Sequence, residues 1–199
     1  MAMRKEDNKR IRWITQEEAA CLKKELPRHL VNAMEFALQT GLRASNITRL
    51  EWSEIDFDRC HAYIPAHQSK SGKAIAVPLN TVAMEVLRKQ KGKHPRFVFS
   101  YKGEPVRWFS NKAWKKALLR AGIHNFKWHD LRHTWASWHV QSGTSLQELQ
   151  QLGGWASFEM VLRYAHLSSD HLRGAAERIS ATNLLQSKVV VPRENQVST

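Results

Sequence analysis

His129-Asp130-Leu131-Arg132-His133 is the stretch of this 199-residue chain that says most about its fold, because a helical pattern continues from it through Gln141. Its first histidine and its arginine are three positions apart, so one helical turn places both side chains on the same face. Arginine suits a phosphate ligand, because its planar fork donates two hydrogen bonds and stays charged at any working pH. The stretch therefore predicts a helix that presents a cation and a histidine together, although a histidine here could also simply cap the helix.

Four further segments surround this stretch in a fixed order and carry related chemistry. They are Thr40-Gly41-Leu42-Arg43, Ser69-Lys70-Ser71-Gly72-Lys73, Leu152-Gly153-Gly154-Trp155 and Arg163-Tyr164-Ala165-His166. The whole set supplies two arginines, a histidine, a lysine and a tyrosine hydroxyl. Cutting a phosphodiester without a metal requires such groups, namely cations for the phosphate, an acid for the leaving oxygen and a nucleophile.

In these segments the chain resembles the catalytic domain of the tyrosine recombinases, the phage integrase family, from about Ile14 to about Arg178. The resemblance implies two arginines that clamp the scissile phosphate, a histidine that assists them, a lysine as general acid and a tyrosine as nucleophile. It also implies a tryptophan at the position where many members carry a second histidine. In that order the residues are Arg43 and Arg132, His129, Lys70, Tyr164 and Trp155. The chain departs from the family at Asn46, where an acidic residue is usual.

Each of these residues also has a more ordinary interpretation. Lys73 lies on the same predicted turn as Lys70, and either lysine could be a simple DNA contact. Trp155 could pack in the core, since the chain has eight tryptophans. An isolated tyrosine such as Tyr164 would usually be a half-buried helix residue. The order of the segments favours the catalytic interpretation over these alternatives.

The pair His129 and His133 also has the spacing of a zinc-binding helix, with two histidines at i and i+4. The usual glutamate is replaced by Asp130, and the sequence shows no obvious third ligand. Zinc hydrolysis would also leave Arg43 and the basic charge without a role. We therefore expect no metal and no cofactor at this site.

The formal net charge of +13 predicts a polyanionic partner and salt-sensitive binding. Charge alone does not separate nucleic acid from an anionic membrane. No apolar run approaches the length of a membrane span, and no signal peptide is recognisable. We therefore expect double-stranded DNA as the partner, no membrane, and a place in the bacterial host cytosol.

Periodicity predicts a mainly α fold with a small antiparallel β-sheet. A capping box at Thr15 and Glu18 predicts the first helix. The second helix is expected at 30–38, and the turn glycine Gly41 separates it from a helix that begins near Ala44. The other expected helices span 80–91, 108–121, 130–141, 146–152, 158–164 and 169–179. A hairpin is expected from strands at 60–65 and 74–78, with Lys70 near its tip, and 97–99 is a candidate third strand.

For the domain organisation we expect a basic linker at 1–14, an integrase-type catalytic domain at 15–180, and a tail at 181–199. The tail could be mobile or dock on a neighbouring subunit. Because the family normally carries a separate clamping domain ahead of the catalytic one, we expect a catalytic fragment that is monomeric alone and binds DNA weakly. The family implies a tetramer of recombinases on DNA.

The function expected from the resemblance is site-specific DNA recombination of integrase type, including viral genome integration. DNA would be cut and rejoined through a 3′-phosphotyrosyl intermediate without ATP. Besides the zinc hydrolase weighed above, two alternatives stay open. A type IB topoisomerase-like enzyme would share the chemistry, and a DNA-binding module that is catalytically silent would share only the charge.

Overall fold

The computed structural model describes residues 11–69, 72–109, 112–167 and 177. Helices dominate this part of the chain, and the strands form two small antiparallel sheets, so the predicted mainly α fold with a small sheet is confirmed. The α-helices are α1 Gln16–Glu25, α2 Arg28–Thr40, α3 Ala44–Arg49, α4 Thr81–Gln90, α5 Lys112–Arg120, α6 Asp130–Gln141, α7 Leu146–Gly153 and α8 Glu159–Leu162. The strands are β1 Ile55–Asp56, β2 His61–Ile64, β3 Ile75–Pro78, β4 Ser100–Tyr101 and β5 Glu104–Pro105. Short 3₁₀ turns occur at η1 Trp52–Glu54, η2 Ala66–Gln68 and η3 Ala165–Leu167.

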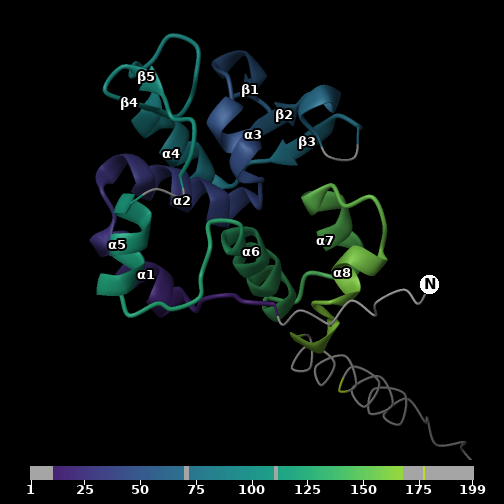
Figure 1. Ribbon diagram of the computed structural model, residues 1–199. Helices are drawn as coiled ribbons and strands as arrows, with labels where there is room; N and C mark the ends of the chain where they lie inside the picture. Colours follow the sequence, from purple (N-terminus) through teal and green to yellow (C-terminus); the bar gives the residue numbers. More distant parts are fainter. Residues whose placement is uncertain (1–10, 70–71, 110–111, 168–176, 178–199) are drawn as a thin grey trace, which may run out of the picture.

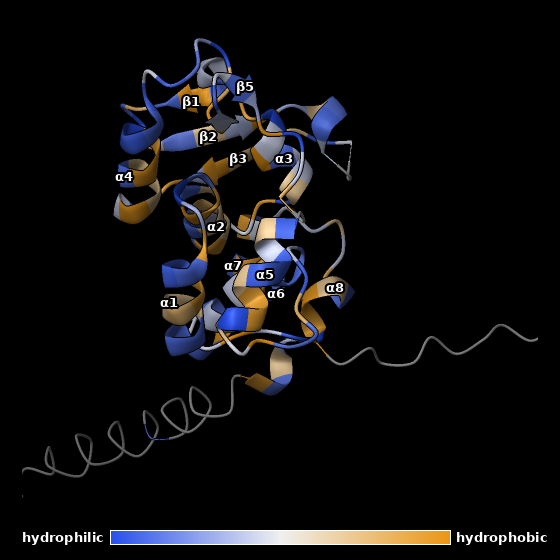
Figure 2. Cartoon of the chain, turned by 60° about the vertical axis from the view of Figure 1, so that its left-hand side comes forward, coloured by the Kyte–Doolittle hydropathy of each residue, from blue (hydrophilic) through white to orange (hydrophobic). Residues whose placement is uncertain are grey.

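Helix α2 is the centre of the fold. It packs against α4 on one side and α6 on the other, and α7 and α8 continue from α6 (Figure 1). Eight of its residues are buried, including Leu30, Phe36 and Leu38. The outer helix α4 instead has one buried face and one polar face, which Figure 2 shows as orange and blue residues on the same helix. Burial of these apolar faces holds α4 against α2, and the buried residues of α6 hold that helix against α2 as well.

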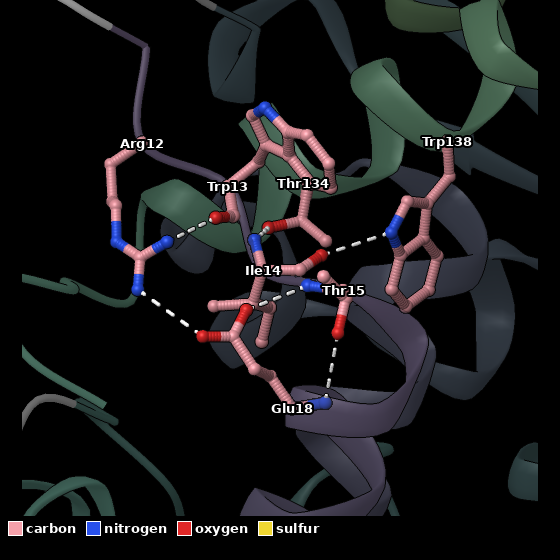
Figure 3. A network of polar contacts seen from close by, with 7 residues as sticks. All are labelled: Arg12, Trp13, Ile14, Thr15, Glu18, Thr134 and Trp138. Carbon is pink, nitrogen blue, oxygen red and sulfur yellow. Dashed lines mark hydrogen bonds and ion pairs between the residues drawn. The ribbon is translucent and has the colours of Figure 1, made fainter. Parts of the chain in front are cut away.

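The N-terminus of α1 is fastened to α6 by a polar network (Figure 3). Thr15 and Glu18 form the predicted capping box, each side chain accepting a backbone hydrogen bond from the other residue. The backbone of Ile14 donates to Thr134 Oγ1 at 3.3 Å and accepts from Trp138 Nε1 at 3.0 Å. The network satisfies backbone groups that a helix start leaves unpaired, and it ties two segments about 120 residues apart.

The predicted hairpin is confirmed in β2 and β3, which pair antiparallel with Ala62 opposite Val77 and Ile64 opposite Ile75. Ala62 and Ile64 are buried and Tyr63 between them is exposed, as expected of a sheet with one face on the core. Lys70, which the sequence predicts near the tip of this hairpin, lies outside the described residues.

Three expected elements differ from the structure. The third strand is β1, not 97–99, because the backbone N–H of Val98 pairs with the carbonyl of Leu50 in a loop and Phe97 forms a single bridge. The helix expected from Trp108 is α5, which begins at Lys112, and Trp108 is an exposed, non-helical residue. The expected helix 169–179 is not one of these three differences, because it lies outside the described residues, apart from residue 177.

The third difference concerns the segment around Tyr164. Helix α8 ends at Leu162, so Tyr164 lies in the turn between α8 and η3 and not on the expected helix 158–164. The turn carries the tyrosine side chain into a small core formed by α6, α7 and α8, which includes Trp135 and Leu149. Tertiary packing has therefore overridden the local helical pattern.

Gly41 generates a stability prediction. It ends α2 in the left-handed region, at φ +62°, and an added Cβ would lie 2.3 Å from the Trp135 ring. We expect Gly41→Ala to lower the free energy of unfolding by roughly 2–4 kcal/mol, from backbone strain and overpacking together. Urea denaturation measures the loss.

Gly92→Ala is the matched control for this prediction. Gly92 also has a left-handed backbone, at φ +83°, but an added Cβ there would meet no atom within 4 Å. Its cost should be only the backbone strain, about 1–2 kcal/mol. Equal losses from the two variants would show that Trp135 accommodates the methyl group.

Candidate active site

Five of the six candidate residues gather around the first turn of α6. Arg132 lies in this turn and His129 immediately precedes the helix at its N-cap position. Arg43 occupies the N-cap of α3, directly after the chain leaves α2 through Gly41. Trp155 follows the end of α7, which lies beside α6, and Tyr164 follows α8, which packs on α7 (Figure 1).

Arg132 is the most tightly held of these side chains. Only 6% of it is exposed, and its Nη1 and Nη2 atoms donate to the carbonyls of Gly41 and Gly153, each at 2.6 Å. Its Cζ lies 4.1 Å from the centre of the Trp155 ring, a cation–π contact. Burial, followed by the charge of Arg43, lowers the Arg132 pKa to about 10, so the guanidinium is still charged at neutral pH.

Arg43 brings a second positive charge to the same place. It is half-buried, and burial lowers its pKa. Within the described residues, no carboxylate forms an ion pair with Arg43 or Arg132. Two desolvated like charges without a counter-ion are unfavourable, and a bound anion would relieve the repulsion. The charge of the pair and its remaining N–H donors suit it to binding an anion, and we call Arg43 and Arg132 the anion site.

Tyr164 lies beside this anion site and is almost completely buried, with 1% exposure. Its hydroxyl is 2.6 Å from Nδ1 of His133. Burial raises the Tyr164 pKa to about 12, although Arg132 and Arg163 act in the opposite direction. The positive charges therefore do not produce a phenolate here, and the phenol keeps its proton at neutral pH.

His133 contacts Tyr164, a role that the sequence pattern does not indicate, since that pattern marks His133 only as the second histidine of a zinc-type pair. Burial, then His129, Arg163 and Arg132, lower its pKa to about 4, so the imidazole is neutral. A neutral imidazole accepts at one nitrogen, and in the tautomer that carries its proton on Nε2 the Tyr164 hydroxyl donates to Nδ1. The signal that could have found it was the i, i+4 spacing from His129, whose ring meets that of His133 edge-on at 5.3 Å.

Trp155 serves as the platform under Arg132 and also packs in the core, so both sequence interpretations describe part of its environment. Its ring lies 5.9 Å from Trp135 and 6.1 Å from Tyr164, measured between centroids. The predicted turn before it begins at Gly154, the C-cap of α7 at φ +59°, whereas Gly153 is the last residue of that helix. A Cβ on Gly153 would lie 2.1 Å from the Trp155 ring, so a glycine is needed for this close approach.

The two candidate lysines are not distinguished by the structure. Lys70 lies outside the described residues, while Lys73 is exposed and lines a cavity of about 330 Å³ beside Trp155 and Gly154. Asn46 is buried, and its Nδ2 donates to the carbonyl of Gln68 at 3.0 Å. This bond holds the chain that leads toward Lys70 against α3.

The described part of the chain contains no group of three His, Cys, Asp or Glu side chains placed to hold a metal ion. Within the same part, no helix is long and apolar enough to cross a membrane.

Comparison with known proteins identifies related sequences over most of the chain. Residues 4–171 match the model of the phage integrase family. The integrase of Salmonella phage P22 is 50% identical over 187 residues, covering 87% of this chain and 48% of that protein. This chain therefore spans about half the length of the curated relative that it matches.

Solved structures show the same fold. The catalytic domain of bacteriophage HP1 integrase superposes with a TM-score of 0.64 at 23% identity, covering 84% of this chain and 94% of that one. The XerH site-specific recombinase, solved in a post-cleavage complex with its palindromic difH substrate, has a TM-score of 0.66 at 21% identity, covering 85% of this chain and 53% of that one.

The His133–Tyr164 pair generates a pH prediction. Because the His133 pKa falls from 6.5 to about 4 on folding, the unfolded chain binds a proton between these values that the folded chain does not. The free energy of unfolding should therefore decrease as pH falls from about 6.5 toward 4. His133→Asn should flatten this decrease, as urea unfolding at a series of pH values would measure.

Nuclear magnetic resonance of the imidazole nitrogens tests the same prediction directly. His133 should be neutral at pH 6, with its proton on Nε2 and Nδ1 accepting from Tyr164. A His133 that titrates near 6.5, or equal pH dependence in wild type and His133→Asn, would contradict the assignment.

Proposed function

This chain belongs to the phage integrase family, and we propose that it cuts and rejoins double-stranded DNA at specific sites through a covalent link to Tyr164. The observation that carries the proposal is the pair of guanidinium groups, Arg43 and Arg132, which stand without a described carboxylate partner beside the Tyr164 hydroxyl. A phosphodiester is the anion that this pair and this nucleophile both suit.

In the proposed reaction, Arg43 and Arg132 bind the non-bridging oxygens of the scissile phosphate. Tyr164 Oη attacks phosphorus and forms the 3′-phosphotyrosyl bond, while the bond from phosphorus to the 5′ oxygen breaks. Lys70 would protonate that oxygen, and His129 would add a donor at the N-terminus of α6. The 5′ hydroxyl of a partner strand then reverses the step, so that the energy of the phosphodiester is kept.

The geometry supports a role for Arg132 that depends on rigidity. Two of its five N–H groups are used by the carbonyls of Gly41 and Gly153, and Trp155 covers one face. Its plane is therefore set before any ligand arrives. Donors that need no reorganisation stabilise the charge that builds up on phosphorus oxygens most effectively.

The rest of the proposal concerns partners and organisation. The net charge of +13 supports DNA as the partner, and XerH was solved with a DNA substrate. We propose that residues 15–180 form the catalytic unit, that the isolated chain is monomeric, and that four copies act together on DNA. Action on DNA in the cytosol of a bacterial host follows from the same proposal.

One observation favours a second candidate function. Tyr164 is 1% exposed and its phenol is protonated, so the described state does not offer the hydroxyl to DNA. A DNA-binding module without catalysis would retain the basic surface and this buried tyrosine. Adduct formation by the wild-type chain distinguishes the two functions.

Tyr164→Phe is the central test. The phenyl ring keeps the packing against Trp155 but removes the hydroxyl, so this variant should bind DNA as wild type does and form no covalent adduct. A nicked suicide substrate traps the adduct, which denaturing gel electrophoresis detects. Tyr101→Phe, at a tyrosine that is 49% exposed, is the control and should react normally. An adduct formed by Tyr164→Phe would refute the assignment of the nucleophile.

Arg43→Ala tests the anion site. We expect single-turnover adduct formation to slow by about 100-fold or more, because a preorganised donor to the developing charge is lost. Binding of the intact duplex should weaken far less. Arg49→Ala, at an exposed arginine on the same helix, is the control and should change cleavage no more than binding. Equal losses of binding and cleavage in Arg43→Ala would make Arg43 an ordinary DNA contact.

A further inference from the structure

The contact between Tyr164 and His133 joins two elements that are far apart in the sequence. The Tyr164 hydroxyl and His133 Nδ1 are 2.6 Å apart across 31 residues, one in the turn after α8 and the other in α6. This distance is at the short end for a hydrogen bond to nitrogen. Because Tyr164 is 1% exposed, bulk water does not reach its hydroxyl, and the imidazole is the group within hydrogen-bond distance of it.

The charged and titratable groups around His133 keep its imidazole unprotonated at neutral pH, so that a nitrogen is free to take up a proton. Besides Tyr164, they are His129 and Arg132 on the α6 side and Arg163 on the side of the turn after α8. These groups and burial favour the neutral imidazole, and in the tautomer protonated at Nε2 its Nδ1 lone pair faces the phenol. A DNA phosphate between the arginines would offset the positive field and so strengthen the imidazole as a base.

We propose that His133 is the general base of the reaction and takes the proton from Tyr164 as the hydroxyl attacks DNA. This inference rests on the function proposed above. As the bond between Oη and phosphorus forms, the proton moves from Oη to Nδ1 of His133. The bond from phosphorus to the 5′ oxygen breaks, and that oxygen receives a proton from the general acid. On rejoining, the 5′ hydroxyl attacks phosphorus and returns its proton to the general acid, the phosphotyrosyl bond breaks, and the imidazolium returns its proton to Tyr164.

The two other nearby candidates fit this role less well. His129 lies at the exposed N-terminus of α6 and meets His133 edge-on, whereas His133 is in direct contact with the phenol. The lysine is already assigned to the opposite transfer, from protein to leaving oxygen. A base in contact with one oxygen and an acid serving the other allow both proton transfers in one step.

His133→Asn separates proton transfer from positioning. The asparagine Oδ1 can still accept from the phenol near the position of Nδ1, but an amide does not take up a proton. We expect the rate of adduct formation on a nicked suicide substrate to fall by about 100- to 10,000-fold while DNA binding stays within about twofold. The wild-type rate should rise with pH along an acidic limb, and His133→Asn should lack that limb.

His139→Asn is the matched control. His139 lies on the same helix, is also half-buried, and contacts a hydroxyl through Nδ1, at 3.0 Å from Thr144 Oγ1. This variant should react at the wild-type rate. A substrate with a 5′-thio leaving group, which needs no proton, should not rescue His133→Asn, because its defect lies on the nucleophile side.

The outcomes separate the inference from the function on which it rests. If the wild-type chain forms adducts and folded His133→Asn forms them equally fast, His133 is not the base. Faster reaction by His133→Asn would also overturn the proposal and show that the contact restrains the tyrosine. If His133→Asn does not fold, His133→Gln takes its place with the same expectations. No adduct from the wild-type chain would instead refute the proposed function.

Discussion

The buried guanidinium of Arg132, held by the carbonyls of Gly41 and Gly153, is the interaction on which the rest of the structure depends. It joins the end of α2 and the end of α7 to the first turn of α6. The partners are neutral carbonyls, so the bonds satisfy two N–H donors of the guanidinium and fix its orientation without neutralising its charge. The fold therefore keeps a buried positive charge, which is costly until an anion binds.

Both carbonyl partners are glycines for a steric reason. A Cβ on Gly41 would lie 2.3 Å from Trp135, and a Cβ on Gly153 would lie 2.1 Å from Trp155. The two indole rings face one another at 5.9 Å, so the same aromatic packing that supports Arg132 also requires the glycines that bind it. Site and core are thus one structure, and a change that loosens the tryptophans would misplace the cation.

The same region holds Tyr164 in a neutral pair with His133. Burial raises the pKa of the phenol and lowers the pKa of the imidazole, so the two groups share a hydrogen bond rather than a proton at neutral pH. The positive charges of Arg132 and Arg163 favour the phenolate, but desolvation outweighs them in this state. A phosphate bound between the arginines would raise the pKa of both groups, because negative charge disfavours the phenolate and favours the imidazolium. The imidazole would then be the stronger base.

The sequence by itself determined the local elements and the inventory of the site. The capping box at Thr15, the turn at Gly41 and the helix from Asp130 to Gln141 were all predictable, because caps and helical periodicity are short-range signals. The ordered segments around Arg43 and Tyr164 also sufficed to indicate the family. They did not show that α8 ends before Tyr164, since local pattern favoured a longer helix.

Only the tertiary structure decided how these residues meet. The carbonyls that hold Arg132 lie 91 and 21 residues away from it, and a backbone carbonyl leaves no mark in the sequence. The contact of His133 with Tyr164 depends on the packing of η3 and the preceding turn against α6, and burial then set both pKa values. Side-chain identity is local information, whereas desolvation and long-range contact arise only when the helices pack.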